Sequence, residues 1–407
     1  MVLYDQITTL EHDLTAPNFS AEIPVEFYLD TKTNNYGKQS ARSASSARRS
    51  RAFQLLFNLW EFSSLDRVRS CRRWSHTSEG QVHVRRTVEG DKVTSGYEGL
   101  AKCGSAWSCP MCARTIEARR REEIRHIVQG ARADGLQIAM LTMTLRHKDG
   151  QSLAKLLDVS GKGYRSVMDS RAVRNRLKEL GLDGYVRVLE INVGRNGWHP
   201  HYHVVLLFDT ELQGVVFDDA LKELADAMFR TWSNKAKKEG LAKPMRDFFH
   251  IERIDAGDVS TYLTKKSFVP NEKNIEAVGF EMAGRTVKDA RGESRTPWDV
   301  FADFTDTGDL DDLDLWHEYE GATKGKRSIT FSRGLKARYV GADVSDQDIV
   351  DEEKGTVEDR IFTIIDWSTV ARKKGLYTKI LDAVEHEGID AALALCVWNG
   401  VPVRAPD

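Results

Sequence analysis

Alternating apolar and polar positions predict several β-strands in the middle of the chain. Residues 138–147, IAMLTMTLRH, alternate as a half-buried strand does. Two apolar runs at residues 184–193 and 198–208 flank the sequence GRNG at residues 194–197, and Asn-Gly between strand-like runs is a strong hairpin signal. Residues 248–254 predict a further strand. The pattern therefore predicts a strand-rich middle region that contains one hairpin.

Helical patterns surround this region. Residues 51–62 look helical, and residues 113–135 read as a long charged helix that ends at a glycine. Residues 153–180 predict helix, and residues 367–400 predict two or three amphipathic helices. We expect these to pack onto the core; the alternative is a small bundle that contacts DNA or another subunit.

Charge is distributed unevenly along the 407 residues, although the formal net charge is only -2. Residues 42–73 hold eight arginines and two acidic residues, which suggests a polyanionic partner. Residues 299–320 hold nine acidic residues and no Lys or Arg. We expect them to form a solvated loop; the alternatives are an intramolecular DNA mimic or a protein contact. No apolar stretch is long enough to span a membrane and no signal peptide is recognisable, so we expect a soluble, cytoplasmic protein.

Three of the five cysteines crowd into the sequence CGSAWSCPMC. In a reducing compartment, clustered thiols more often hold a metal than form disulfides, and thiolates are preferred zinc ligands. The alternatives are a CxxC redox pair, or reduced thiols packed as small hydrophobic groups. Cys71, upstream of this sequence, is the expected fourth zinc ligand, and His76 is the alternative to it. Cys396 is expected to be a core thiol. The predicted zinc ligands are Cys71, Cys103, Cys109 and Cys112.

The predicted hairpin brings a carboxylate close to two histidines. If the strands pair symmetrically across residues 194–197, Glu190 lies opposite His201 and Val188 lies opposite His203. Period-2 alternation then directs Glu190, His201 and His203 to one face, whereas a register shift of one residue would turn Glu190 away. Two imidazoles and a carboxylate form an open site for Mn²⁺ or Mg²⁺, with water and substrate phosphate in the remaining positions.

The histidines also admit other interpretations. His199, which Pro200 keeps extended, either faces the same side or only flanks the site. The HxH spacing occurs in metal-dependent hydrolases built on barrels as well, and surface histidines on an edge strand would give the same pattern. Their alternation at the start of the apolar run VVLLF favours metal binding.

A second constellation follows the strand at residues 248–254. On a helix expected to start near Asp258, Tyr262 lies four residues after Asp258 and three before Lys265, so the three side chains share one face. Tyr262 is a candidate nucleophile for a phosphodiester, because a nearby cation helps to form phenolate. Each residue also has a simpler explanation: Asp258 as a helix cap, Tyr262 as a half-buried aromatic and Lys265 as a solvated charge.

These motifs resemble a known superfamily. The sequence HPHYH leading into a strand and the later YLTK are similar to the HUH endonucleases. Together with CGSAWSCPMC and WHEYEGATKGKRSITFSRGL, they resemble the single-tyrosine plasmid rolling-circle replication initiators over residues 71–335. The resemblance implies the following roles: His201 and His203 hold a divalent ion with Glu190 as third ligand, Tyr262 is the nucleophile, and Lys265 is its YxxK lysine. Asp258 stands where these enzymes have a glutamate that activates water at termination.

The resemblance also implies an α+β fold, with a central antiparallel sheet of about five strands flanked by helices in the ferredoxin-like palm of HUH endonucleases. A Cys-rich zinc-binding insertion and C-terminal helices would complete it. The expected organisation is a flexible Ser/Arg-rich leader at residues 1–50, an Arg-rich and Cys-cluster region at 51–135, the catalytic core and family extension at 136–335, and a helical region at 336–407.

The implied activity is metal-dependent, sequence-specific nicking and joining of a plasmid origin through a 5′-phosphotyrosine intermediate. The implied partners are single-stranded or extruded origin DNA, with host helicase and DNA polymerase as further candidates. Two alternatives remain. An HUH transposase or relaxase would use the same chemistry, and a non-catalytic zinc-containing DNA-binding protein would use the histidines structurally.

Overall fold

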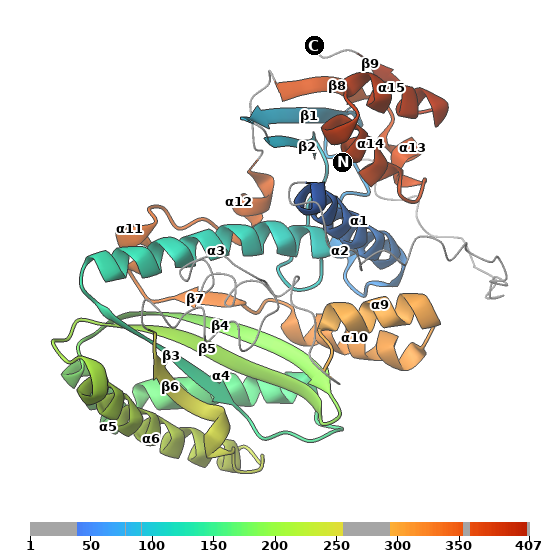
Figure 1. The fold of residues 1–407 in the computed structure, drawn as a ribbon. Coiled ribbons are helices and arrows are strands. Elements are labelled where there is room, and N and C mark those ends of the chain that lie inside the picture. The colour runs from blue at the N-terminus through green and yellow to red at the C-terminus, as the bar shows by residue number, and fades with distance from the viewer. Residues whose placement is uncertain (1–38, 78, 91, 255–293, 353–358, 405–407) are drawn as a thin grey trace, which may run out of the picture. The chain divides into compact units, whose positions relative to one another are not determined.

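The computed structural model describes residues 39–77, 79–90, 92–254, 294–352 and 359–404 (Figure 1). Its larger sheet has five antiparallel strands in the order β6-β3-β5-β4-β7. The expectation of an α+β protein with a five-stranded antiparallel sheet is therefore confirmed. The strands are β3 (Gln137–Thr144), β4 (Leu182–Gly194), β5 (Gly197–Phe208), β6 (Phe249–Arg253) and β7 (Ile329–Phe331).

Strands β4 and β5 form the predicted hairpin. Gly194 pairs with Gly197, and Glu190 pairs with His201, as the symmetric register requires. Gly197 has a φ of 76°, which a residue without a Cβ adopts without strain. The turn sequence thus sets the register, and the register decides which side chains of the hairpin meet.

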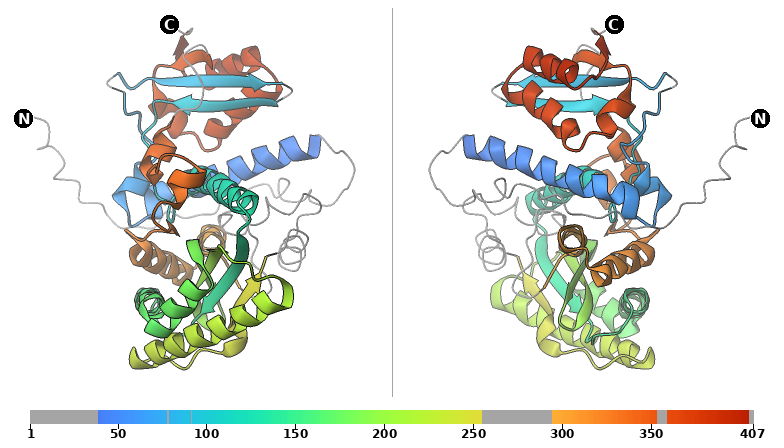
Figure 2. Two further views of the ribbon diagram at one scale, coloured as in Figure 1. Left: turned by 90° about the vertical axis from the view of Figure 1, so that its left-hand side faces the viewer. Right: turned by 90° about the vertical axis from the view of Figure 1, so that its right-hand side faces the viewer.

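Helices cover both faces of this sheet, as two views of Figure 2 show. Helix α3 packs on one face, where its Ile127 contacts a cluster that includes Val205 of β5. Helices α4 and α6 lie on the other face, where Leu206 and Phe208 are fully buried. Burial on both sides explains why VVLLF is a continuous apolar run. The helices are α3 (Pro110–Ala133), α4 (Leu153–Asp169), α5 (Arg171–Glu179) and α6 (Gly214–Lys238), and the 3-10 helix η2 (Arg246–Phe248) precedes β6.

A second sheet was not expected. It has four antiparallel strands in the order β2-β1-β8-β9, and it joins the segment between Cys71 and Cys103 to the C-terminal region. The expected helical region at residues 336–407 therefore also contributes strands, because Phe362 and Ile364 of β8 pair with Val84 and Val82 of β1. The strands are β1 (Val82–Glu89), β2 (Lys92–Glu98), β8 (Arg360–Ile364) and β9 (Val403–Arg404). The helices of this region are α11 (Leu335–Tyr339), α12 (Asp346–Asp351), α13 (Trp367–Ala371), α14 (Leu376–His386) and α15 (Ile389–Trp398).

The acidic stretch at residues 299–320 is not a loop. It forms α9 (Pro297–Thr307) and α10 (Leu310–Thr323). A capping box between Thr296 and Asp299 starts α9, and Glu320 is fully buried, where it accepts a hydrogen bond of 2.6 Å from the Ser63 hydroxyl. The expectation of a solvated loop is wrong because several carboxylates of this stretch have buried partners.

Helix α1 (Gln39–Phe62) begins before residue 50, where the flexible leader was expected to end, and α2 (Asp66–Arg69) follows it. Arg49 forms ion pairs with Asp382 and Glu385 of α14. Phe53 stacks on Tyr377 with ring centroids 3.8 Å apart. None of the helices in the described parts of the chain is long and apolar enough to cross a membrane.

Candidate functional site

Glu190, His201 and His203 converge on the face of the five-stranded sheet that also carries α3. The Nε2 atoms of His201 and His203 lie 3.5 and 3.6 Å from Oε2 of Glu190. All three candidate ligand atoms lie within 4.8 Å of one another, and the three side chains are largely shielded from solvent. The hairpin thus gathers two imidazoles and one carboxylate around one point, a donor set that suits a divalent cation.

The second polar atom of each of these side chains has a partner of its own. Oε1 of Glu190 accepts a hydrogen bond of 3.2 Å from Nδ2 of Asn192. Nδ1 of His201 lies 3.3 Å from the carbonyl oxygen of His199, so it is the protonated nitrogen of that ring. Nδ1 of His203 lies 3.4 Å from the hydroxyl of Thr142. These contacts orient both Nε2 atoms and Oε2 toward the shared point, as metal-binding side chains usually are.

The contact from Asn192 leads to a testable prediction. We expect Asn192→Ala to weaken Mn²⁺ binding about tenfold, because outer contacts to metal ligands typically contribute roughly 10- to 100-fold in affinity. Calorimetric titration of the protein with Mn²⁺ measures this. Asn175→Ala, at an exposed position of α5, is the matched control. Equal affinities for the two variants would contradict an orienting role for Asn192.

His199 flanks the three converging side chains. Its ring stacks on His147, with centroids 4.8 Å apart, and lies 4.9 Å from the ring of His201. Burial, together with the neighbouring His201 and His147, lowers the pKa of His199 to about 3, although Glu190 partly opposes the shift. Burial also lowers the pKa of His147. This imidazole pair is therefore neutral at pH 7 and adds no charge beside the site.

The same face carries polar residues that the sequence analysis missed. His203, Thr142 and His250 are paired in one row across β5, β3 and β6, so their side chains share a face. His250 is 29% exposed and its Nε2 lies 3.5 Å from Oε1 of Glu252. The alternation in FHIER indicates that His250 and Glu252 face the same way. Only the strand order shows that they lie on the face of the sheet that carries Glu190, His201 and His203, here called the metal face.

The remaining predicted catalytic residues lie outside the described residues. These are Asp258, Tyr262 and Lys265, and the last strand before them is β6, which ends at Arg253.

The four cysteines of the predicted zinc site form a buried cluster. Cys71 follows α2, Cys103 follows β2, and Cys109 and Cys112 start α3. The sulfur of Cys71 lies 3.6 Å from that of Cys109 and 3.7 Å from that of Cys112, which lies 3.7 Å from that of Cys103. A disulfide would need about 2.05 Å, whereas a tetrahedral site with zinc–sulfur bonds of about 2.3 Å has sulfur–sulfur edges of about 3.8 Å. The cluster therefore has the dimensions of a tetrahedral metal site, and His76 is exposed and outside it.

A partly buried arginine accompanies this cluster. Arg72 has a φ of 57°, in the left-handed region, and donates a hydrogen bond of 3.1 Å to the hydroxyl of Tyr377. Burial alone would lower the pKa of Arg72, but Tyr377, Cys71, Cys112 and Cys109 raise it on balance. Hydrogen bonds from the neighbouring thiols, together with the charge of Arg72, hold the pKa of the Cys112 thiol well below its usual range. The ionised thiolate is the form that binds a metal.

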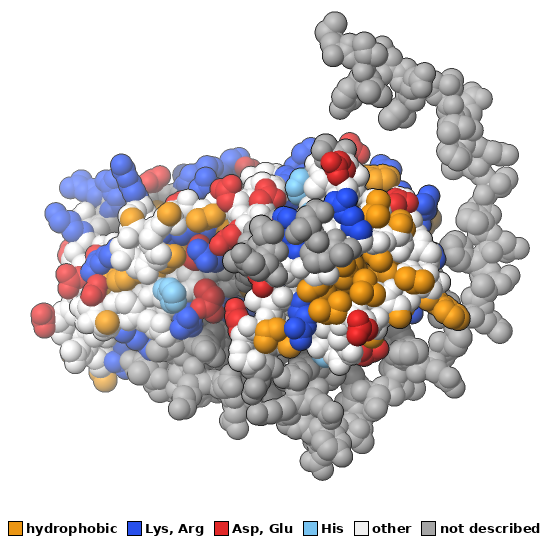
Figure 3. Space-filling model, turned by 90° about the horizontal axis from the view of Figure 1, so that it is seen from above, with side chains coloured by type: hydrophobic (Ala, Val, Ile, Leu, Met, Phe, Trp, Pro, Cys, Tyr) orange, Lys and Arg blue, Asp and Glu red, His pale blue; other side chains and the backbone are white. Residues whose placement is uncertain are grey.

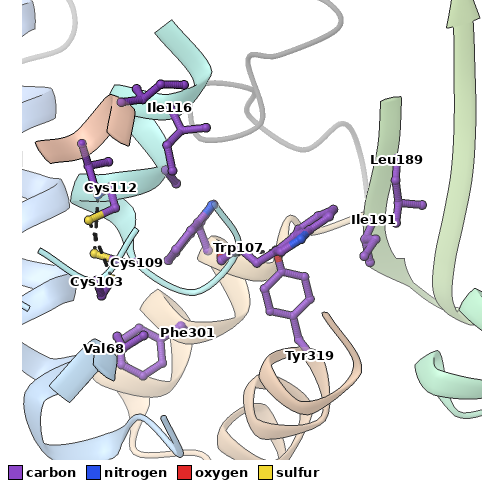
Figure 4. Packing of buried hydrophobic residues seen from close by; sticks show 14 of the residues in the cluster. Val68, Cys103, Trp107, Cys109, Cys112, Ile116, Leu189, Ile191, Phe301 and Tyr319 are labelled. Carbon is purple, nitrogen blue, oxygen red and sulfur yellow. Dashed lines mark hydrogen bonds between the residues drawn. The ribbon is translucent and has the colours of Figure 1, made fainter. Parts of the chain in front are cut away.

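Aromatic side chains connect the cysteine cluster to the hairpin. Figure 4 shows Cys109 and Cys112 in the same packed cluster as Trp107, Tyr319 and Ile191 of β4. The ring of Tyr319 lies 6.2 Å from that of Trp107 and 6.1 Å from that of Trp198 of β5. The cysteine cluster and the hairpin are therefore parts of one continuous hydrophobic core.

Comparisons with known proteins agree with these features. Residues 100–218 match the model of the family described as replication protein. Protein rep from Streptomyces lividans is 28% identical over 331 residues, which cover 66% of this chain and 70% of the relative. A neomycin resistance protein from Streptomyces cyanogenus is 25% identical over 307 residues, which cover 60% of this chain and 69% of the relative. No solved structure gives a significant match. The resemblance seen in the motifs is thereby confirmed: the chain is similar to replication proteins of the Rep type.

Proposed function

We propose that this protein starts plasmid replication by nicking one strand of origin DNA in a metal-dependent reaction. The observation that carries the proposal is the convergence of Glu190, His201 and His203 on one point, in a hairpin that lies inside the family-matched residues 100–218. We also propose that the five-stranded sheet is the HUH palm, with the core at residues 136–335 and the Arg-rich, Cys-cluster region at 51–135. The match to replication proteins supports origin DNA as the substrate.

The reaction follows from the residues in their proposed roles. The phenolate oxygen of Tyr262 bonds to the scissile phosphorus while the bond from phosphorus to the 3′ oxygen breaks. The leaving oxygen takes a proton to become a 3′-hydroxyl that primes synthesis, and the 5′-phosphate stays on Tyr262. A bound Mn²⁺ or Mg²⁺ would polarise the scissile phosphate and stabilise negative charge on its oxygens.

Two further residues complete the proposal. Lys265, three residues after Tyr262, would stabilise the phenolate. Asp258 would accept a proton from the water that hydrolyses the phosphotyrosine bond at termination, which frees the enzyme from DNA after one round. His250, which lies on the same face of the sheet as Glu190 and the two histidines, would hydrogen-bond a DNA phosphate beside the scissile one.

We further propose that the cysteine cluster binds zinc in a structural role. Four buried thiols without a histidine or carboxylate match structural zinc sites, which are closed, and leave no open position for a substrate. The ion would connect α2, the segment after β2 and the start of α3.

Covalent capture tests the nicking proposal. We expect a denaturation-resistant adduct when the protein is incubated with Mn²⁺ and single-stranded fragments of its own replicon, with the DNA attached to Tyr262 in peptide mass spectra. Tyr262→Phe should abolish the adduct, because it removes the only atom proposed to bond to phosphorus, while Tyr339→Phe serves as the matched control. Fragments that bind without becoming attached would contradict the proposal and favour a non-catalytic DNA-binding protein.

A further inference from the structure

Helix α15 is unusual for a surface helix because it is apolar on nearly all sides. Its sequence is IDAALALCVW, yet its buried residues are Ala392 and Cys396, while Val397 is 70% and Trp398 is 89% exposed. A helix that is apolar all round is normally enclosed by protein. The exposed end of α15 is therefore a candidate contact surface.

Three consecutive cations lie beside this end of the helix. Arg372, Lys373 and Lys374 follow α13 and are all exposed. The ammonium group of Lys373 donates a hydrogen bond to the carbonyl oxygen of Asn399, the residue after Trp398. This bond places the basic triplet next to the exposed indole.

The positive charge of the triplet is only partly balanced. Arg372 donates a hydrogen bond of 3.0 Å to the Ser368 hydroxyl, and Asp366 is the carboxylate near it. Within the part of the chain that the structure describes, no carboxylate pairs with Lys373 or Lys374. Figure 3 looks onto the side where α15 and β9 lie in Figure 1, and hydrophobic side chains gather there beside Lys and Arg side chains.

We propose that Arg372, Lys373, Lys374, Val397 and Trp398, here called the Trp398 surface, form a second contact site for single-stranded DNA. An unpaired base stacks on the indole of Trp398, and adjacent phosphates contact the cations, which is how proteins bind single strands without reading their sequence. Val397 extends the apolar contact to the next base or sugar. The site rests on the proposed function, since nicking and strand displacement produce single-stranded DNA.

Charge favours DNA over a second copy of this chain as the occupant. In a two-fold contact through Trp398, the same patch of each subunit would meet its copy, so the two basic triplets would lie close together. Like charges at such a contact oppose association. A polyanion with exposed bases satisfies both the cations and the indole.

The affinity of the full-length protein for a fluorescein-labelled oligo(dT), measured by fluorescence anisotropy without added divalent metal, tests the Trp398 surface. We expect Trp398→Ala to weaken binding at least about fivefold, because a base stacked on an aromatic side chain contributes that much or more. In the double variant Lys373→Ala/Lys374→Ala, the slope of log affinity against log salt should fall by about 1.4, since each phosphate contact to a single strand contributes about 0.7.

Two matched controls separate this site from general effects. Trp74→Ala removes another exposed indole, which is 52% exposed, and Lys237→Ala/Lys238→Ala removes an exposed basic pair at the end of α6. The proposal predicts that both controls bind oligo(dT) within twofold of the unaltered protein. Thermal unfolding of each variant checks that the fold is intact.

The outcomes distinguish this site from the proposed function. If the unaltered protein does not nick DNA but Trp398→Ala weakens oligo(dT) binding, the Trp398 surface is supported and the nicking proposal is overturned. If the unaltered protein nicks DNA, but Trp398→Ala and the lysine double variant both bind oligo(dT) as tightly as the controls, only the Trp398 surface is overturned. An equal loss of affinity for a duplex would overturn base stacking, and a dimer that Trp398→Ala dissociates without changing DNA affinity would identify a self-association surface instead.

Discussion

Replacing His203 with alanine is expected to lower the nicking rate by at least about 10³-fold at a fixed, moderate Mn²⁺ concentration. The side chain is buried, and its Nε2 lies 3.6 Å from Oε2 of Glu190, so its loss removes one of three converging donors. A metal at a phosphoryl centre contributes several kcal/mol of transition-state stabilisation, and about 1.4 kcal/mol corresponds to tenfold in rate. Single-turnover cleavage of an origin fragment measures the effect.

A double variant makes this experiment more specific. Because Glu190 and His203 would act through the same ion, Glu190→Ala/His203→Ala should be no slower than the slower of the two single variants. His126→Ala, at an exposed position of α3, should nick at the rate of the unaltered protein. Multiplicative losses in the double variant would mean that the two side chains act independently, contrary to a shared metal site.

The sequence predicted the hairpin correctly because all the information is local. The GRNG turn, the alternation on both sides and the position of Glu190 lie within 25 consecutive residues, 184–208. Symmetric pairing across the turn then determines that Glu190 meets His201. The fourth cysteine of the cluster, Cys71, was also placed correctly, since few other thiols were available.

The second sheet could not be predicted in this way. Strand β8 has five residues, and its partner β1 lies roughly 280 positions earlier in the chain, where Val84 pairs with Phe362. No local turn sequence connects the two strands, so the pattern of the C-terminal region predicted its helices but not these strands. Pairing between distant segments depends on the whole fold and not on short-range pattern.

Charge misled the interpretation of residues 299–320. Counting carboxylates suggested a solvated loop, but Trp298, Phe301 and Trp316 pack against one another beneath them. Asp312 is buried because Arg295 donates two hydrogen bonds of 2.8 Å to its carboxylate. The partner lies outside the acidic stretch, so the charge count of the stretch alone could not reveal it.

Among the substitutions considered, replacing one cysteine of the four-cysteine cluster should lower the stability of the fold most. We expect Cys109→Ser to lose one zinc ion per chain and to lower the free energy of unfolding by more than about 4 kcal/mol, in the range of changes that accompany loss of a structural metal. Cys109 caps α3, whose later turns pack on the five-stranded sheet, and its sulfur accepts a hydrogen bond from the backbone N–H of Cys112. Losing the ion would therefore loosen the helix that covers the metal face.

The measurement combines metal content by mass spectrometry with thermal unfolding followed by circular dichroism. For a chain of this length, a loss of this size corresponds to a decrease of roughly 5 °C in the unfolding temperature. Cys396→Ser is the matched control, because Cys396 is fully buried but lies outside the cluster, so it should lose some stability while keeping its zinc. If purified protein contains no zinc and Cys109 is found in a disulfide with Cys112, the cluster is a redox pair instead, and Cys109→Ser should then change stability no more than Cys396→Ser does.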